Sequence, residues 1–303
     1  MGACQTLAAE PDTEELEILP PPGNMQRTLR SVVRIQATWR GHRLRSQLRS
    51  SQVHIVTARL GPFDFGAELK QPGVVRRVPL RVEDGLYTGE WNSHTRQREG
   101  RGTLDLSAGS RYEGFWLRDQ PHGRGRMIYA NGDVYEGEWL EGKRHGKGTL
   151  TSLEGTYAGT WAQGLQHGQG NEVCSDGSHY KGLFFHGQRH GLGTLQWRDG
   201  SCYEGEFRRG EIEGAGTYIG SDQSSHTGLW RKGKRHGRGC FRTSDGRVFE
   251  GTYVEDQRQG RGVLRLPDGS CRTGVWKAGR NASEEDEADP EDSQVKSTSS
   301  SQC

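Results

Sequence analysis

Apolar and polar residues alternate through most of residues 87–280. In the stretch from Tyr135 to Trp139, Tyr-Glu-Gly-Glu-Trp, the two aromatic residues and the glycine face one side of a strand, because side chains alternate between its two faces. A second alternating stretch follows, with an apolar residue two positions beyond its last glycine, and only Glu172 breaks this column. The column contains Leu104, Met127, Leu150, Leu195, Tyr218, Phe241 and Leu264. The pattern therefore predicts two antiparallel strands in each unit.

The two-strand unit recurs at nearly constant spacing. Successive units start 23 residues apart, except for 25 after Tyr87 and 22 after Tyr135. A fixed period of this size is typical of repeat architectures. About eight units and a truncated ninth predict an all-β repeat fold, an elongated single-layer antiparallel meander of about sixteen strands. The leading position is held by Tyr87, Tyr112, Tyr135, Tyr157, Tyr180, Tyr203, His226, Phe249 and, in the truncated unit, Arg272.

Two recurring polar elements predict turns. Asn-Gly or Asp-Gly pairs favour type I′ hairpin turns, which need two residues with positive φ. A His-Gly pair recurs in the other connection, and Glu99, Glu213 or Gln259 replaces its histidine elsewhere. A catalytic residue is needed only once, so we interpret this pair as a turn element. Residues 220–225 lack the Asp-Gly pair and His226 replaces the leading aromatic residue, so we expect a local irregularity there. The Asx-Gly pairs begin at Asn131, Asp176, Asp199, Asp245 and Asp268, and the His-Gly pairs at His122, His145, His167, His190 and His236.

The repeated Tyr-x-Gly-x-Trp, followed by Gly-x-x-His-Gly-x-Gly, resembles the MORN repeat over residues 87–280. The resemblance implies a sheet that serves as a binding platform, with a helix or peptide of a protein partner lying along its aromatic rows. A glycine inside a strand indicates a close approach to the backbone, here by the neighbouring rings. The expected partner-binding face comprises Tyr112, Trp116, Tyr135, Trp139, Tyr157, Trp161, Tyr180 and Tyr203.

Composition agrees with a one-dimensional stack of repeats. The chain has a hydrophobic fraction of 30%, a mean hydropathy of −0.89 and 46 glycines, too little aliphatic material for a large closed core. A net charge of +2 gives no reason to expect nucleic acid as a partner. The six cysteines show no zinc-ligand spacing, so no metal or cofactor is expected. Without a secretory h-region or an eighteen-residue apolar run, we expect a cytoplasmic protein.

A basic segment precedes the repeats. Residues 26–49 carry seven arginines and no acid, together with apolar residues at helical spacing, which predicts an amphipathic helix over residues 26–50. The order Ile-Gln-x-x-x-Arg-Gly-x-x-x-Arg resembles an IQ motif, which implies binding to calmodulin or a related EF-hand light chain. An alternative is a helix that caps the sheet. The expected calmodulin-binding residues are Ile35, Gln36, Trp39, Arg40, Gly41 and Arg45.

The remaining segments carry weaker patterns. Residues 1–25 are expected to be disordered, and their start fits an N-myristoylation signal at Gly2, with Cys4 as a palmitoylation candidate. Residues 51–86 form a connecting segment, in which Val53–Leu60 and Val74–Val82 are expected to be strands of a degenerate cap. The acidic tail over residues 281–303 is expected to be disordered.

Three functions fit these features. The first is a non-enzymatic scaffold that holds a protein partner on its sheet and an EF-hand protein on its helix. The second is a membrane-associated adaptor, anchored by acyl chains and by basic turns such as Lys143-Arg144 and Lys234-Arg235 that contact anionic lipid; the alternative for these turns is a solvated edge that keeps the sheet from associating edge to edge. The third, from the family resemblance, is a structural component of cilia or flagella. An enzyme is not expected, because no polar constellation occurs in a single copy.

Overall fold

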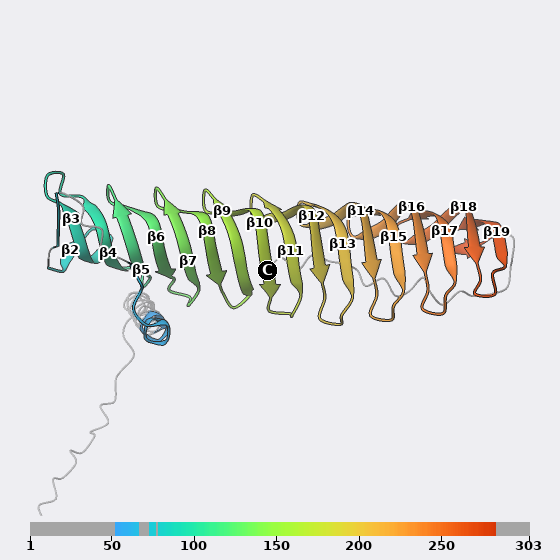
Figure 1. Ribbon diagram of the computed structural model, residues 1–303, viewed down its shortest axis with the longest axis horizontal. Coiled ribbons are helices and arrows are strands. Elements are labelled where there is room, and N and C mark those ends of the chain that lie inside the picture. The colour runs from blue at the N-terminus through green and yellow to red at the C-terminus, as the bar shows by residue number, and fades with distance from the viewer. Residues whose placement is uncertain (1–51, 67–72, 77, 283–303) are drawn as a thin grey trace, which may run out of the picture. The chain divides into compact units, whose positions relative to one another are not determined.

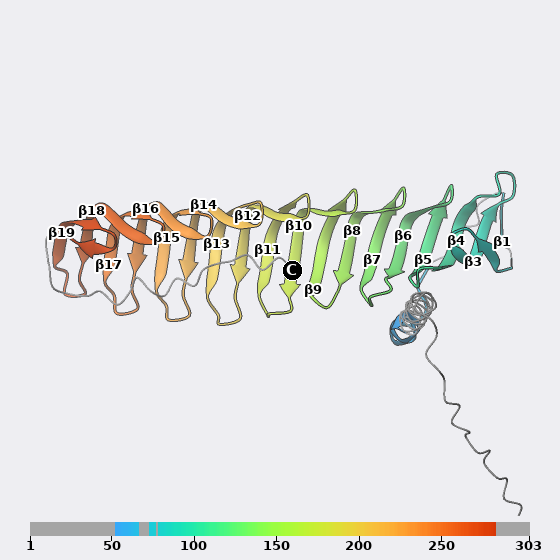
Figure 2. The same cartoon turned by 180° about the vertical axis from the view of Figure 1, so that it is seen from behind.

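The computed structural model describes residues 52–66, 73–76 and 78–282. Within these ranges the strands form one antiparallel sheet, in which each strand from β3 to β20 pairs with the next in sequence. Figures 1 and 2 show this sheet as a single layer of hairpins following one another along its length. The predicted all-β meander is confirmed. The predicted helix over residues 26–50, residues 1–25 and residues 283–303 of the tail lie outside the described residues, whereas Asn281, expected to begin the disordered tail, ends strand β20.

The predicted units correspond to hairpins of the sheet. Eight units give the sixteen strands β3 to β18, and the truncated ninth gives β19 and β20. Two short strands, β1 and β2, pair with opposite ends of β3. The strands are β1 (Val74–Arg76), β2 (Leu80–Val82), β3 (Gly85–Asn92), β4 (Arg98–Leu106), β5 (Arg111–Leu117), β6 (Gln120–Ile128), β7 (Val134–Leu140), β8 (Lys143–Thr151), β9 (Gly155–Ala162), β10 (Leu165–Cys174), β11 (His179–Phe185), β12 (Gln188–Gln196), β13 (Cys202–Arg208), β14 (Glu211–Ile219), β15 (Ser225–Arg231), β16 (Lys234–Arg242), β17 (Val248–Val254), β18 (Gln257–Arg265), β19 (Cys271–Lys277) and β20 (Arg280–Asn281).

The Asx-Gly pairs form hairpin turns, but not of the predicted type. Only the glycine has positive φ, +94° at Gly132, and its N–H donates to the carbonyl of Tyr129 at 2.9 Å. This is the three-residue loop that ends in a glycine bulge. The two-residue turns with positive φ at both positions lie at the opposite edge, for example at Glu141 (+49°) and Gly142 (+75°). The Asx-Gly pairs were therefore correctly predicted to form turns, but the type I′ geometry predicted for them occurs in the turns at the opposite edge.

The expected irregularity over residues 220–225 is absent. Gln223 takes the place of the glycine with a φ of +69°, and its N–H donates to the carbonyl of Gly220 at 3.0 Å. The N–H of Ser224 donates to Oδ1 of Asp222 at 3.0 Å, which holds the loop in its usual form. β14 and β15 consequently pair without a register shift.

The His-Gly pairs lie inside strands and not in the tight turns. In β8, His145 pairs with Glu138 of β7, and the register shifts between this pair and the next. Gly146 follows with a φ of +57°, so the extra residue forms a β-bulge. The carboxylate of Glu138 accepts the N–H of Lys147 at 3.2 Å, one of the backbone donors that the bulge leaves unpaired. The element is architectural, as interpreted, but it is a bulge and not a turn.

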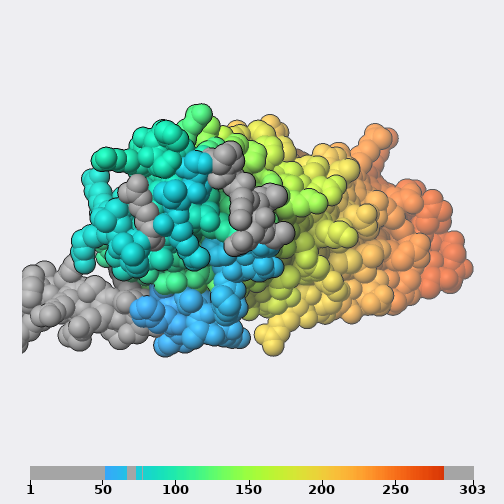
Figure 3. Space-filling view, turned by 60° about the vertical axis from the view of Figure 1, so that its left-hand side comes forward, coloured from blue at the N-terminus to red at the C-terminus, as the bar shows by residue number. Residues whose placement is uncertain are grey.

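Residues 52–60 form a helix, which corrects the strand expected at Val53–Leu60. Val53, Ile55 and Thr57 stand at alternating positions, yet only Val53 among them is buried while Ile55 is 68% exposed. The Thr57 hydroxyl donates to the carbonyl of Val53 at 2.8 Å, four residues back, as in a helical turn. Figure 3 shows this helix in blue beside the N-terminal hairpins. The strand expected over Val74–Val82 is confirmed as the two short pieces β1 and β2.

Candidate partner-binding surface

The aromatic residues form two columns that interlock along one face of the sheet, the ladder face. Neighbouring rings meet edge to face, with centroids 4.9–5.6 Å apart, and the series continues without interruption from Trp91 to Trp276. Edge-to-face packing of this kind stabilises beyond the area it buries. The first column contains the leading residues Tyr87 to Phe249, and the second contains Trp91, Trp116, Trp139, Trp161, Phe184, Phe207, Trp230, Tyr253 and Trp276.

The polar atoms of the ladder bond within the sheet. The Tyr112 hydroxyl donates to the carbonyl of Phe115 at 3.0 Å, and Nε1 of Trp116 donates to the carbonyl of Gly102 at 3.1 Å. The same two bonds recur in the next unit, from Tyr135 and Trp139. Burial raises the pKa of the Tyr112 hydroxyl far above its usual value. All eight residues expected to form the partner-binding face lie in this ladder and are buried.

The glycine within each aromatic strand makes room for the tyrosine ring. A Cβ atom at Gly114 would lie 2.5 Å from the hydroxyl oxygen of Tyr112, and one at Gly125 of the next strand only 2.2 Å from it. The ring therefore lies over a pair of facing glycines, as the sequence pattern predicts. The ladder depends on this close approach.

Arginines cover one side of the ladder. The guanidinium carbon of Arg144 lies 4.3 Å from the centroid of Trp161, and its Nη2 donates to the carbonyl of Gly164 at 2.8 Å. Arg189 lies 5.0 Å from Tyr180 and pairs with Glu172 at 2.7 Å, which explains the one acid in the apolar column. Arg235 lies 4.9 Å from the ring of Tyr253, so both arginines expected to face lipid, Arg144 and Arg235, make cation–π contacts with the ladder. The lysines are paired as well, Lys143 with Gln163 and Lys234 with Glu255, both at 2.8–2.9 Å.

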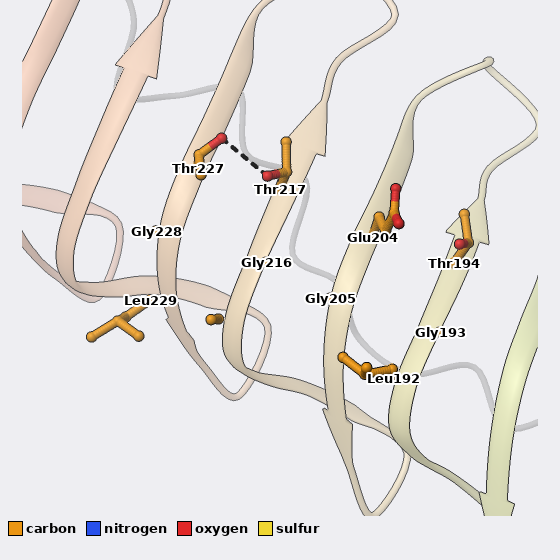
Figure 4. A pocket seen from close by; sticks show the side chains of 11 residues that line it. Leu192, Gly193, Thr194, Glu204, Gly205, Gly216, Thr217, Thr227, Gly228 and Leu229 are labelled. Carbon is orange, nitrogen blue, oxygen red and sulfur yellow. Dashed lines mark hydrogen bonds between the residues drawn. The ribbon is translucent and has the colours of Figure 1, made fainter.

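The opposite side of the sheet, the open face, carries exposed residues. Leu192 is 66% exposed and Leu229 46%, whereas Leu195 and Trp230 of the same strands, on the ladder face, are buried. A hollow of about 720 Å³ lies between these two leucines, with Thr194, Glu204 and Thr227 on its walls (Figure 4). A second hollow of about 1090 Å³ adjoins it at Thr227 and continues over β16 to β19. The open face therefore holds a long groove.

Part of the open face is covered by the chain itself. Residues 61–66, Gly-Pro-Phe-Asp-Phe-Gly, which we call the strap, lie against β4, β5 and β6. Phe65 meets Phe115 edge to face at 5.8 Å, and Phe63 is 7% exposed. The sequence pattern did not predict this contact, although two phenylalanines at alternating positions between glycines were its available signal.

A comparison with protein-family models identifies the repeats. The MORN-repeat model matches seven segments, 112–134, 135–156, 157–179, 180–202, 203–225, 226–246 and 249–271, which make up more than half of the chain. The chain belongs to the MORN-repeat family. The structure adds the hairpin of β3 and β4 ahead of the first matched MORN repeat and the hairpin of β19 and β20 after the last.

A second family model, the IQ calmodulin-binding motif, matches residues 29–49. The match contains all six residues expected to bind calmodulin, and it confirms the IQ motif beside the MORN repeats. The IQ segment lies outside the described residues, as do Gly2 and Cys4. Among the described residues, no group of three or more metal-ligating side chains occurs, and no helix is long and apolar enough to cross a membrane.

Comparison with curated proteins gave no match. Among solved structures, the chain is similar to the TCP domain of SAS-4 (dCPAP) of Drosophila melanogaster, in complex with a proline-rich motif of Ana2 (dSTIL). The identity is 15% and the TM-score 0.34, over 51% of this chain and 84% of that one. The TCP10 domain of Danio rerio CPAP matches at 11% identity and a TM-score of 0.37, over 67% of this chain and 95% of that one.

Proposed function

We propose that this MORN-repeat protein is a non-catalytic scaffold. It holds calmodulin or a related EF-hand light chain on its IQ helix and a protein partner on the open face of its sheet. The observation that carries the proposal is the presence in one chain of an IQ match and of a sheet whose exposed groove lies opposite its aromatic core.

The IQ residues fit the chemistry of an EF-hand protein. In the proposed complex Ile35 enters the apolar cleft of one lobe, Gln36 hydrogen-bonds to nearby backbone, and Arg40 and Arg45 meet the acidic rim. A basic amphipathic helix suits this mode of recognition. Ca²⁺ then acts on the scaffold through the bound protein, which carries the metal sites.

The open face is the surface that we assign to the second partner. The aromatic residues of the ladder are buried and hydrogen-bonded within the sheet, so a partner cannot reach them without disrupting its core. The open face instead exposes Leu192 and Leu229, which line a hollow that a side chain can enter. An exposed apolar patch rimmed by polar residues is typical of a protein-interaction site.

Calmodulin capture from solution tests the first half of the proposal. Wild type should bind immobilised calmodulin, the double variant Ile35→Ala/Gln36→Ala should not, and Thr38→Ala, at a variable position of the motif, should bind like wild type. Capture with and without Ca²⁺ separates a constitutive from a switched interaction. Equal capture of wild type and the double variant would reject the assignment of these residues.

A membrane adaptor is the alternative, and it depends on acylation at Gly2 and Cys4. Its other support, the basic turns, is weakened because the guanidinium groups of Arg144 and Arg235 pack on the rings of the ladder. Myristate alone anchors a protein only marginally. If Gly2→Ala leaves the distribution between membrane and soluble fractions unchanged from that of wild type, the acyl-anchored adaptor is rejected in favour of the scaffold.

A further inference from the structure

Four arginines gather on the open face of β16 and β18, near the C-terminal end of the sheet (Figure 1). Arg238 and Arg242 stand four residues apart on β16, and Arg261 and Arg265 hold the equivalent positions of β18. Residues four apart point to the same face of a strand. All four arginines are exposed, and no other even-numbered strand from β4 to β14 has a base at both positions. The positive charge is therefore a feature of this part of the sheet.

The acids of this region do not neutralise the arginines. Glu250 of β17 is the only acid in strands β15 to β19, and it lies in register with the residues midway between the two arginines of β16 and of β18. Its carboxylate lies 3.7 Å from Nη2 of Arg265. Four arginines and one glutamate leave three net positive charges. Arg238, Arg242 and Arg261 form no hydrogen bond or ion pair with any of the described residues.

Arginines elsewhere on the open face bind carboxylates. Nε of Arg111 on β5 lies 2.9 Å from a carboxylate oxygen of Glu113, and Nη2 of Arg126 on β6 lies 2.5 Å from the other oxygen. The planar guanidinium group has donors spaced to match a carboxylate, so such pairs are among the stronger ionic contacts. The three arginines without a partner on β16 and β18 are suited to the same chemistry.

The chain leaves the sheet beside these arginines and then becomes acidic. The last described residue, Ala282, donates its N–H to the carbonyl of Val275 at 2.8 Å. Val275 lines the 1090 Å³ hollow together with Arg238 and Arg261. Residues 284–292, Glu-Glu-Asp-Glu-Ala-Asp-Pro-Glu-Asp, which we call the acidic segment, contain seven acids and no base. β19 and β16 are about 14 Å apart across the sheet, and five extended residues span about 16 Å, so the segment is long enough to reach both arginine strands.

We propose that the acidic segment of this chain binds the open face of β16 to β18, with its carboxylates paired to Arg238, Arg242 and Arg261. Bound there, it lies over the 1090 Å³ hollow, which adjoins the hollow between Leu192 and Leu229. The segment thereby covers one end of the groove assigned to a protein partner, and a partner that uses the whole groove must displace it. This displacement rests on the proposed function, whereas binding of the acidic segment does not.

A separate copy of the segment measures whether the site exists and whether the chain fills it. The probe is a peptide of residues 283–293, Ser-Glu-Glu-Asp-Glu-Ala-Asp-Pro-Glu-Asp-Ser, labelled with a fluorophore and followed by anisotropy on titration with the full chain. Wild type should bind it weakly, because the tethered segment competes at an effective concentration on the order of millimolar. A neutralised chain, in which the seven acids of residues 284–292 are changed to glutamine or asparagine, should bind the peptide at least about tenfold more tightly.

Two further variants of the neutralised chain locate the site. Arg238→Gln/Arg261→Gln should weaken peptide binding at least about tenfold, because two charge-assisted contacts are lost. Lys147→Gln/Lys181→Gln removes two exposed charges from the open face of β8 and β11 and should leave peptide binding unchanged. All four positions are exposed, so the substitutions should leave the sheet folded, which circular dichroism checks.

Three outcomes would overturn the proposal. A peptide that does not bind the neutralised chain, or that binds it equally well without the two arginines, would reject the site. Equal binding to wild type and to the neutralised chain would mean that the arginines take an acidic partner from outside and not the chain's own segment. Calmodulin capture by the same preparations reads the IQ motif alone, so failure of the tail contact is distinguishable from failure of the proposed scaffold.

Discussion

His226 is the one histidine in the column of leading aromatic residues, and it should weaken the fold. Its side chain is 1% exposed, with the rings of Trp230 and Tyr253 at 5.2 and 5.0 Å. Neither ring nitrogen has a hydrogen-bond partner among the described residues. A neutral imidazole must keep one N–H, and a buried donor without a partner costs about 1–3 kcal/mol. His226→Tyr, which restores the common residue and its hydroxyl bond to backbone, should raise the free energy of unfolding by that amount at pH 7.5.

The difference in the free energy of unfolding between His226→Tyr and wild type should grow as the pH falls. Burial, with a smaller contribution from nearby Arg235, lowers the pKa of His226 to about 3. The pKa of a histidine in the unfolded chain is near 6.5. Between that pH and the pKa of the folded state, the unfolded state therefore binds a proton at this residue and the folded state does not. Stability from this residue is therefore complete above about pH 6.5 and is lost as the pH falls towards 3. At pH 5 the loss should be about 2 kcal/mol, at 1.36 kcal/mol per pH unit.

Urea unfolding followed by tryptophan fluorescence, at pH 7.5 and pH 5, measures both effects. The gap between His226→Tyr and wild type should grow by about 2 kcal/mol between the two pH values. His54→Tyr, at an exposed histidine of the 52–60 helix, should shift neither curve by more than about 0.5 kcal/mol. A gap that stays constant with pH, or a variant less stable than wild type, would refute the account of a buried neutral histidine.

The remaining predictions concern the ladder, an ion pair and the turns. Gly125→Ala should lower the free energy of unfolding in urea by about 1–3 kcal/mol or more, because the added methyl group overlaps the hydroxyl of Tyr112. Arg124→Ala, at the neighbouring exposed position, should change it by no more than about 0.5 kcal/mol. Equal effects of the two variants would contradict the close approach of the ring. Glu113→Gln breaks a buried ion pair of 2.5 Å and should cost about 3–5 kcal/mol, whereas Glu136→Gln, at the equivalent exposed position of the next unit, should cost little. The Asp176 carboxyl accepts bonds from a serine hydroxyl and N–H, which lower its pKa, so its NMR titration midpoint should lie below that of an ordinary aspartate; an ordinary midpoint would mean that the turn is not held this way.

The repeat architecture was predictable because its signals are local and repeated. Alternation places Tyr135, Gly137 and Trp139 on one face, and the facing glycines leave only one place for the tyrosine ring. The structure confirms this in successive hairpins, through the hydroxyl bonds of Tyr112 and Tyr135 and the indole bond of Trp139. The position of the Asx-Gly turns was equally clear, since the glycine is needed at positive φ in either turn type.

The turn types and the functional face were harder to predict. Whether two or three residues close a loop depends on the strand register, and the bulge at His145 shifts that register by contacts between strands. The sequence makes the aromatic rows prominent but does not show that they bury one another, so a core was interpreted as a binding surface. The helix at 52–60 and the strap are determined by tertiary contacts, such as Arg126 with Gly61, that lie 65 residues apart.

Spectrophotometric titration of the tyrosines tests the central claim, that the aromatic ladder is the core of the sheet and leaves the opposite face for partners. Nine tyrosines are present, and burial raises the pKa of six that lead the repeats, Tyr87, Tyr112, Tyr135, Tyr157, Tyr180 and Tyr203. Unfolded tyrosines ionise near pH 10, so stability should fall as the pH rises above that value. The account predicts that most tyrosines stay protonated at about pH 11 while the sheet is intact, and ionise together when it unfolds. Reversible ionisation of most of them near pH 10, with the sheet intact by circular dichroism, would show that the ladder is open to solvent and would contradict the account.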